Sequence, residues 1–284
     1  MMLCDTHVHV VGDPAAYPMI ANCTYTPAIA GIETLQQLGE RHGIGRFVIV
    51  QPSFYGTDNT LLIDALAKLG DRGRGVAVID PAATAPSALS ALHAAGVRGL
   101  RINLYSAHGA ARDNPADQFT ALAAVAVEMG WHVQVIAPLL LLAGMADILG
   151  ASPAPVVIDH YGLPGGATPD SGEGQRLLGL LRHRHAWVKL SAPYRSTGDD
   201  MGVEPDPAWL AALLDAAGPR CLWGSDWPHT PAHLSHQGQG VPLPYRSLDY
   251  GRVIAAFRAA MPSAAAADAV MGANPARLYE FPDQ

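Results

Sequence analysis

The sequence lacks the cysteine patterns of a disulfide framework or a structural zinc knuckle. Its three cysteines are an odd number, and no two of them have a CxxC spacing. Cys4 and Cys221 lie within apolar runs, where a cysteine is expected to be a small buried side chain. The cysteine usage therefore favours a protein of a reducing compartment.

Basic runs and membrane-length apolar segments are also missing. The net charge is −7, which argues against nucleic acid or an anionic membrane as the main partner. No basic-then-apolar leader precedes the first apolar run, and the apolar run 138–148 is too short for a membrane span and contains Asp147. We therefore expect a soluble, cytoplasmic protein that acts on a small molecule. The sequence leaves open whether it forms a homo-oligomer.

A regular series of short apolar segments is present instead. Hydrophobic residues make up 49% of the chain, which is enough for a substantial core. Eight segments have strand length, and most are rich in Val and Ile: 3–10, 46–51, 74–80, 97–103, 131–137, 155–160, 186–191 and 220–225. Helical patterns, several with Pro near the start or Gly after the end, lie at 32–42, 59–69, 86–95, 115–129, 138–149, 174–184 and 207–217.

This alternation predicts the α/β class and one (β/α)8 TIM-barrel domain over residues 1–284. The competing architecture is an open doubly wound sheet. Such a sheet normally carries a Gly-rich phosphate turn after an early strand, whereas residues 11–14 read Val-Gly-Asp-Pro. The sequence therefore favours the barrel.

Polar side chains gather at the predicted strand ends, where a barrel carries its chemistry. His7 and His9 are two residues apart on the first strand, so their side chains point to the same side. A lone pair of this kind is more often ordinary polar filling. The case for function is stronger because His160 and Asp226 end two other predicted strands. We predict that these four groups converge in the barrel mouth.

Several motifs of this sequence resemble those of the amidohydrolase superfamily. More narrowly, they resemble its lactonase branch, which includes 2-pyrone-4,6-dicarboxylate lactonase and sugar-lactone hydrolases. The motifs are DTHVH at 5–9, VIDH at 157–160 and WGSDWPH at 223–229. Further matches are QPSFYGTDN at 51–59, GLRIN at 99–103 and NPARLY at 274–279. The resemblance extends over nearly the whole chain and implies a barrel hydrolase.

The resemblance argues against a binuclear metal centre. Binuclear members carry a bridging carboxylated lysine on the fourth strand and histidines on the fifth and sixth. Here the fourth strand offers Arg101 and Asn103, and the fifth offers Gln134. His132 begins the fifth strand too early to reach the mouth and is expected to be structural. Two metals therefore lack ligands.

A single divalent metal, with zinc as the first candidate, has suitable ligands in His7, His9, His160 and Asp226. The lactonase branch contains both metal-free enzymes and enzymes with one zinc. Arg101 adds positive charge near the centre, which disfavours a cation. The sequence therefore predicts either no metal or one metal, with a slight preference for a metal-free or weakly occupied site.

The resemblance implies that water attacks the carbonyl of a lactone or related cyclic ester. In this hypothesis Asp226 is the general base, and the three histidines polarise the carbonyl directly or through zinc. Arg101 and Arg195 are candidate anchors for a substrate carboxylate. For Arg195 a structural salt bridge is an equal alternative. The candidates for additional hydrogen bonds, each with loop packing as its alternative, are Ser53, Tyr25 and Tyr161.

Two departures from the dicarboxylate lactonase limit the substrate. That enzyme has additional arginines after its fourth strand and after its sixth-strand histidine. The corresponding segments here are YSAH at 105–108 and YGLP at 161–164, which carry neither arginine. We therefore predict a substrate with at most one carboxylate. The loop 230–244, which contains Gly and Pro, is predicted to act as a lid.

Three alternatives to a lactone hydrolase remain. A metal-dependent decarboxylase of the same superfamily typically carries an acidic residue in the first-strand motif, where this chain has His7 and His9. A lactone isomerase needs the same anchoring with a changed acid–base arrangement. A binding protein on a barrel that has lost its activity predicts damage at a convergent position, and none is seen.

Overall fold

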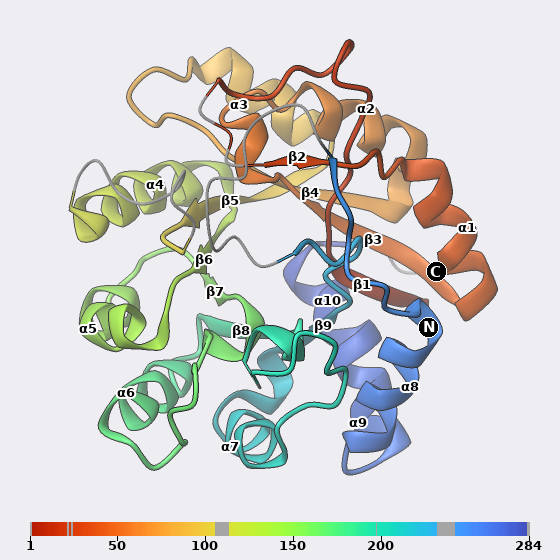
Figure 1. Cartoon of the computed structure of the whole chain (residues 1–284). Coiled ribbons are helices and arrows are strands. Elements are labelled where there is room, and N and C mark those ends of the chain that lie inside the picture. Colours follow the sequence, from red (N-terminus) through yellow and green to blue (C-terminus); the bar gives the residue numbers. More distant parts are fainter. Residues whose placement is uncertain are drawn as a thin grey trace.

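The computed structural model describes residues 2–21, 23, 25–105, 114–196, 198–231 and 242–282. Its centre is a parallel barrel of eight strands in the order β1-β3-β4-β5-β6-β7-β8-β9, surrounded by helices (Figure 1). The strands are β1 (Leu3–Val8), β3 (Ile44–Val50), β4 (Gly73–Ala77), β5 (Val97–Asn103), β6 (His132–Ile136), β7 (Val156–Ile158), β8 (Ala186–Ser191) and β9 (Cys221–Gly224). Each of them corresponds to a predicted strand, so the barrel prediction is confirmed.

The barrel is closed between its last strand and its first. Val8 forms a parallel bridge with Trp227, and the Thr6 hydroxyl donates a 2.7 Å hydrogen bond to the carbonyl oxygen of Trp223. The backbone N–H of Asp226 donates to the carbonyl oxygen of His7 at 2.9 Å. The closure gives hydrogen-bond partners to backbone groups at the edges of β1 and β9. It also brings Asp226 beside the β1 histidines.

Helices cover the outside of the barrel. Seven match the predicted segments within a few residues at each end: α1 (Ile32–His42), α2 (Thr60–Leu69), α3 (Pro86–Ala94), α4 (Pro115–Met129), α5 (Leu139–Gly150), α6 (Gly172–Leu181) and α7 (Pro207–Ala217). The structure adds α8 (Tyr250–Ala260), α9 (Ala264–Asp268) and α10 (Asn274–Leu278), for which we had no prediction. A short pair, β2 (Thr26–Pro27) and β10 (Pro242–Leu243), lies apart from the barrel.

Local sequence explains where these helices begin and end. Asp206 precedes α7 and its carboxylate accepts a hydrogen bond from the backbone N–H of Trp209, with Pro207 at the first helical position. Gly43 ends α1 in the left-handed conformation, at φ 73°, which a glycine adopts without steric cost. No helix in the described part of the chain has the length and apolar character to cross a membrane.

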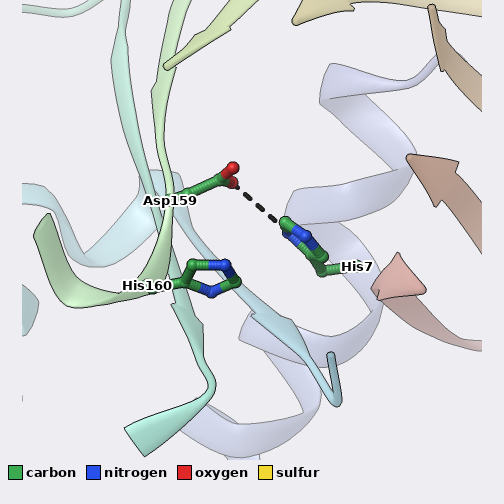
Figure 2. A group of neighbouring side chains, drawn as sticks. All are labelled: His7, Asp159 and His160. Carbon is green, nitrogen blue, oxygen red and sulfur yellow. Dashed lines mark ion pairs between the residues drawn. The ribbon is translucent and has the colours of Figure 1, made fainter. Parts of the chain in front are cut away.

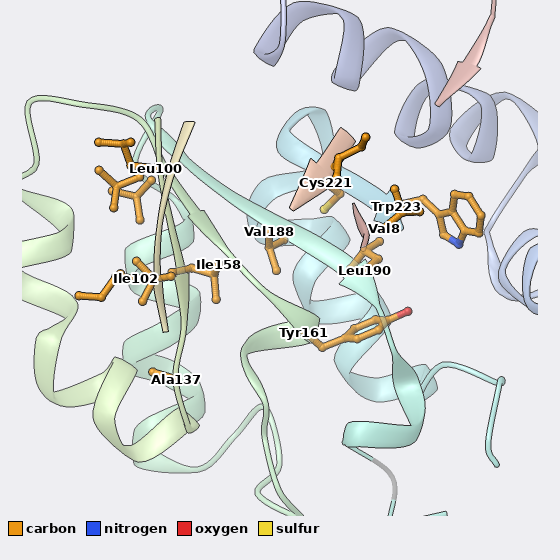
Figure 3. Packing of buried hydrophobic residues seen from close by; sticks show 14 of the residues in the cluster. Val8, Leu100, Ile102, Ala137, Ile158, Tyr161, Val188, Leu190, Cys221 and Trp223 are labelled. Carbon is orange, nitrogen blue, oxygen red and sulfur yellow. The ribbon is translucent and has the colours of Figure 1, made fainter. Parts of the chain in front are cut away.

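The strands are rich in buried apolar residues because helices cover one side and the barrel interior fills the other. Ile102, Val188 and Leu190 are among the buried side chains of the main cluster (Figure 3). A second cluster contains Tyr279 and Phe281 of the C-terminal segment. His132 is buried with its ring edge-on to Tyr279, at 5.3 Å between centroids. This packing agrees with the structural role predicted for His132.

Parts of two predicted features lie outside the described residues. These are positions 106–108 of the YSAH segment and positions 232–241 of the predicted lid. The lid therefore stays a prediction.

Candidate active site

Asp226 lies at the centre of the predicted cluster, directly after β9. Its Oδ1 atom is 3.5 Å from Nε2 of His9, 3.7 Å from Nε2 of His7 and 4.0 Å from Nε2 of His160. All four side chains are buried. Asp226 has a backbone φ of 62°, a strained conformation for a residue with a side chain. The structure thus brings the four predicted residues together at the C-terminal ends of three strands.

Hydrogen bonds to the other ring nitrogen define how two of the histidines are oriented. Nδ1 of His9 lies 2.7 Å from the carbonyl oxygen of Val50. A carbonyl only accepts, so Nδ1 carries a proton, and Nε2 is the ring nitrogen that faces Asp226. Nδ1 of His160 lies 2.9 Å from the Ser191 hydroxyl, which is able to donate or accept. His160 is therefore compatible with either tautomer.

The second oxygen of Asp226 is held by two neighbours on η4 (Pro193–Arg195). The Tyr194 hydroxyl donates to Oδ2 at 2.5 Å, and Nε and Nη2 of Arg195 donate to the same atom at 3.0 and 2.9 Å. Burial raises the pKa of the Asp226 carboxyl, but the positive charge of Arg195 outweighs it and holds the pKa well below its usual range. Asp226 is therefore ionised at neutral pH, with Oδ1 facing the histidines.

The buried rings of His7 and His160 are neutral because burial disfavours their charged form. Burial lowers the pKa of His160 to about 4, although the carboxylates of Asp226 and Asp159 act against this shift. Burial likewise holds the pKa of His7 well below its usual range. Each ring therefore has one protonated and one unprotonated nitrogen at neutral pH, and its tautomer decides whether it donates or accepts.

A small cavity of about 40 Å³ opens onto the cluster. Its lining residues come from the strand ends and the loops that follow them: His9, Tyr25, Pro52, Ser53, Phe54, Arg101, Asn103, Tyr105, Ile136, His160, Arg195, Asp226 and Thr230. Four of the five side chains predicted to contact the substrate therefore line this cavity. Tyr161 is the exception, because it packs in the hydrophobic core (Figure 3) and does not line this cavity.

The two candidate arginine anchors have different surroundings. Nη1 of Arg101 donates to the Gln51 carbonyl oxygen at 3.1 Å, and its buried Nε has no hydrogen-bond partner among the described residues. Arg195 is engaged by Asp226, and its Nη2 also donates to the Thr230 hydroxyl at 2.8 Å. The salt-bridge alternative considered for Arg195 is thus present in the structure. Arg101 is the arginine with unused donor capacity.

Sequence reasoning did not assign a role to three residues that contact the cluster. Tyr194 bonds Asp226, and the Ser191 hydroxyl lies beside His160. Oδ1 of Asp159 lies 3.3 Å from Nδ1 of His7, as Figure 2 shows. The sequence signals were a position at or just after a strand end and, for Asp159, membership of the VIDH motif, and neither reveals which group the side chain contacts.

The donor set at the centre fits one divalent cation. His7 Nε2 and Asp226 Oδ1 are buried without hydrogen-bond partners among the described residues, and Nε2 of His9 lies 3.5 Å from the same Asp226 oxygen. Acceptors facing one another repel unless positive charge lies between them. Ligand atoms of His7, His9 and Asp226 lie within 4.8 Å of one another, as do those of His7, Asp159 and His160. The two groups share His7.

An eight-stranded parallel barrel with paired histidines on β1, a histidine after β7 and an aspartate after β9 defines the class of amidohydrolase-type barrel enzymes. The amidohydrolase family model matches residues 4–281, so the chain belongs to this family.

The individual relatives agree with this assignment. The chain is 32% identical over 235 residues to a 2-pyrone-4,6-dicarboxylate hydrolase of Comamonas testosteroni, covering 79% of this chain and 76% of the relative. It is 31% identical over 280 residues to a 4-sulfomuconolactone hydrolase of Rhizobium radiobacter, covering 97% and 89%. A crystal structure from Agrobacterium tumefaciens has the same fold, with a TM-score of 0.82, 24% identity and coverage of 100% and 97%.

Proposed function

We propose that this protein hydrolyses a lactone or related cyclic ester. The observation that carries the proposal is the position of Asp226, whose free Oδ1 faces three histidine nitrogens at 3.5 to 4.0 Å. This arrangement combines an ionised carboxylate for proton transfer with groups that stabilise a developing oxyanion. The lactone hydrolases among its relatives support the same reaction class.

Asp226 acts as the general base toward the attacking water. Tyr194 and Arg195 occupy Oδ2, so Oδ1 is the oxygen that receives the proton. A carboxylate with a lowered pKa is a weak base, and its advantage is position rather than strength. The proton is then available to the alcohol oxygen that leaves when the lactone opens.

His160 is the histidine suited to polarise the carbonyl directly. With the Ser191 hydroxyl donating to Nδ1, its Nε2 carries the proton and donates to the carbonyl oxygen. His9 differs, because its Nδ1 proton is engaged by the Val50 carbonyl oxygen. In its neutral form, His9 is therefore an acceptor or a metal ligand.

The residues that would hold a single divalent metal are His7, His9 and Asp226, and His160 joins them in its other tautomer. When bound, such a cation supplies Lewis acidity and lowers the pKa of a coordinated water. Arg101, whose positive charge the sequence analysis counted against a cation, is itself attracted by the carboxylates of Asp159 and Asp226.

The substrate in this proposal carries at most one carboxylate. Arg101 is its anchor, since the side chain lines the cavity and has an unused donor. Arg195 lines the same cavity but already binds the Asp226 carboxylate. Ser53 and Tyr25 lie where they are able to add hydrogen bonds to the bound lactone.

A panel of neutral, monocarboxylate and dicarboxylate lactones tests this proposal. In weakly buffered solution each hydrolysis event releases one proton, which a pH-stat records. We expect proton release with neutral or monocarboxylate lactones and little with pyrone dicarboxylate. Gas release would instead indicate decarboxylation. A rearranged lactone without proton release would indicate isomerisation, and binding without reaction would indicate a binding protein.

A further inference from the structure

A chain of buried polar side chains leads from the interior of the barrel to His7. Nζ of Lys189 on β8 lies 2.7 Å from Oε1 of Gln134 on β6. Nε2 of Gln134 lies 3.0 Å from Oδ2 of Asp159, and Oδ1 of Asp159 lies 3.3 Å from Nδ1 of His7. All of these side chains are fully or almost fully buried. Burying this much polarity is costly unless every group has a defined partner.

The donor and acceptor properties of these groups allow only one orientation of the Gln134 amide. The Lys189 ammonium has donors only, and its other contact, the Thr6 carbonyl oxygen at 2.6 Å, is an acceptor. The oxygen of the Gln134 amide must therefore face Lys189, and its NH2 group must face Asp159. Burial lowers the pKa of Lys189 to about 8, so the ammonium is still charged at neutral pH.

Asp159 connects these buried side chains to His7 in the active site. Asp159 receives the Gln134 NH2 group on Oδ2, and Figure 2 shows its carboxylate turned toward His7. An ionised Asp159 is an acceptor on both oxygens, and its Oδ1 forms an ion-pair contact of 3.3 Å with Nδ1 of His7. Neither atom has a hydrogen-bond partner elsewhere among the described residues, so this carboxylate stabilises the His7 proton on Nδ1. Nε2 of His7 is then unprotonated and points toward Asp226 Oδ1, 3.7 Å away.

We propose that Lys189, Gln134 and Asp159 are positioning residues that fix His7 in its Nδ1–H tautomer. Neither Lys189 nor Gln134 contacts the cavity, and they act through Asp159. The chain makes His7 an acceptor or a metal ligand, as His9 is, and leaves His160 as the neutral histidine able to donate. The consequence for catalysis rests on the lactone hydrolysis proposed above, whereas the tautomer itself does not.

Asp159→Asn provides a sharp test, because the amide has the shape of the carboxylate. Gln134 still presents its NH2 group, so the new amide must place its oxygen toward Gln134. Its own NH2 group then faces Nδ1 of His7, and Nδ1 must accept. The variant is therefore expected to invert the tautomer, with the proton on Nε2 of His7.

The measurement is long-range 1H–15N NMR of protein with 15N-labelled histidine, stripped of metal with EDTA. The His7 signals are identified by their loss in His7→Gln. We expect Nδ1–H for His7 in the unmodified protein and Nε2–H in Asp159→Asn, with Asp147→Asn at an exposed position of α5 as the control. If hydrolysis occurs, kcat in Asp159→Asn falls about 10- to 100-fold, with a smaller change in KM.

Nε2–H in the unmodified protein, or an unchanged tautomer in a folded Asp159→Asn protein, would overturn the proposal. If Asp159→Asn does not fold, Asp159→Ala supplies the second test. Without the carboxylate no acceptor faces Nδ1 of His7, so a mixture of His7 tautomers is expected, and a single unchanged tautomer contradicts the proposal. Failure to hydrolyse any lactone would refute the proposed function but leave the tautomer result intact.

Discussion

The Tyr194 hydroxyl donates a 2.5 Å hydrogen bond to Oδ2 of Asp226, so one oxygen of the central carboxylate is fixed while the other faces the histidines. Arg195 donates to the same Oδ2 atom. In the proposed mechanism the two oxygens of Asp226 therefore have separate tasks, orientation for Oδ2 and proton transfer for Oδ1. Each task is open to a separate test.

Tyr194→Phe removes the hydroxyl and keeps the ring. We expect kcat to fall about 10-fold with little change in KM, because the substitution loses one hydrogen bond to a charged group that orients the base. Steady-state kinetics on the best lactone measures this effect. Tyr17→Phe, which removes an exposed hydroxyl bonded to Asp64, is the matched control. A change confined to KM would place Tyr194 in substrate binding instead.

Arg101→Met tests the carboxylate anchor. A guanidinium–carboxylate contact in a buried site contributes on the order of 1.5–3 kcal/mol, so KM for a monocarboxylate lactone is expected to rise about 10- to 100-fold. KM for a neutral lactone of similar size should change little. Comparing the two substrates in one variant separates anchoring from general damage. Equal losses for both substrates would refute the anchor.

Zinc titration tests the number of metal sites. After removal of metal with EDTA, we expect the protein to bind one equivalent of Zn²⁺, measured by calorimetry. At a free concentration of 100 times Kd, binding stabilises the fold by about 2.7 kcal/mol. His9→Ala should weaken this binding, since it removes one of the converging ligands. Two equivalents, or none, would contradict the site described here.

Acid stability should depend on His132. Burial lowers its pKa from 6.5 to about 3, so the unfolded chain binds a proton at His132 before the folded protein does. The stabilisation is present above pH 6.5 and is lost as the pH falls from about 6.5 to about 3. Its upper limit is on the order of 5 kcal/mol.

Urea unfolding across this pH range measures the effect. His132→Leu should have a flatter dependence of unfolding free energy on pH, and the same exchange at exposed His183 is the control. An identical slope for His132→Leu and the unmodified protein would show that His132 does not have this role.

The strands and four central residues were predictable because both depend on local spacing. The apolar runs repeat at strand length, and His7 and His9 share a strand face whatever the rest of the chain does. Parallel strands then bring His160 and Asp226 to the same end of the barrel.

The partners of these residues were not predictable in the same way. The contacts of Asp226 with Tyr194 and of His7 with Asp159 depend on side-chain directions across neighbouring strands, which spacing does not give. The contact of Arg195 with Asp226 and the packing of Tyr161 in the core also depend on side-chain directions. The helices after residue 249 were not predicted, although Asp249 caps α8 by accepting from the backbone N–H of Arg252.

The most direct test of the central claim is proton release by Asp226→Asn in the pH-stat, with the best lactone as substrate. The side chain keeps its shape but no longer accepts a proton from water, so the account predicts a loss of kcat of about 10²- to 10⁴-fold in a folded protein. Turnover within a few-fold of the unmodified protein would contradict Asp226 as the base.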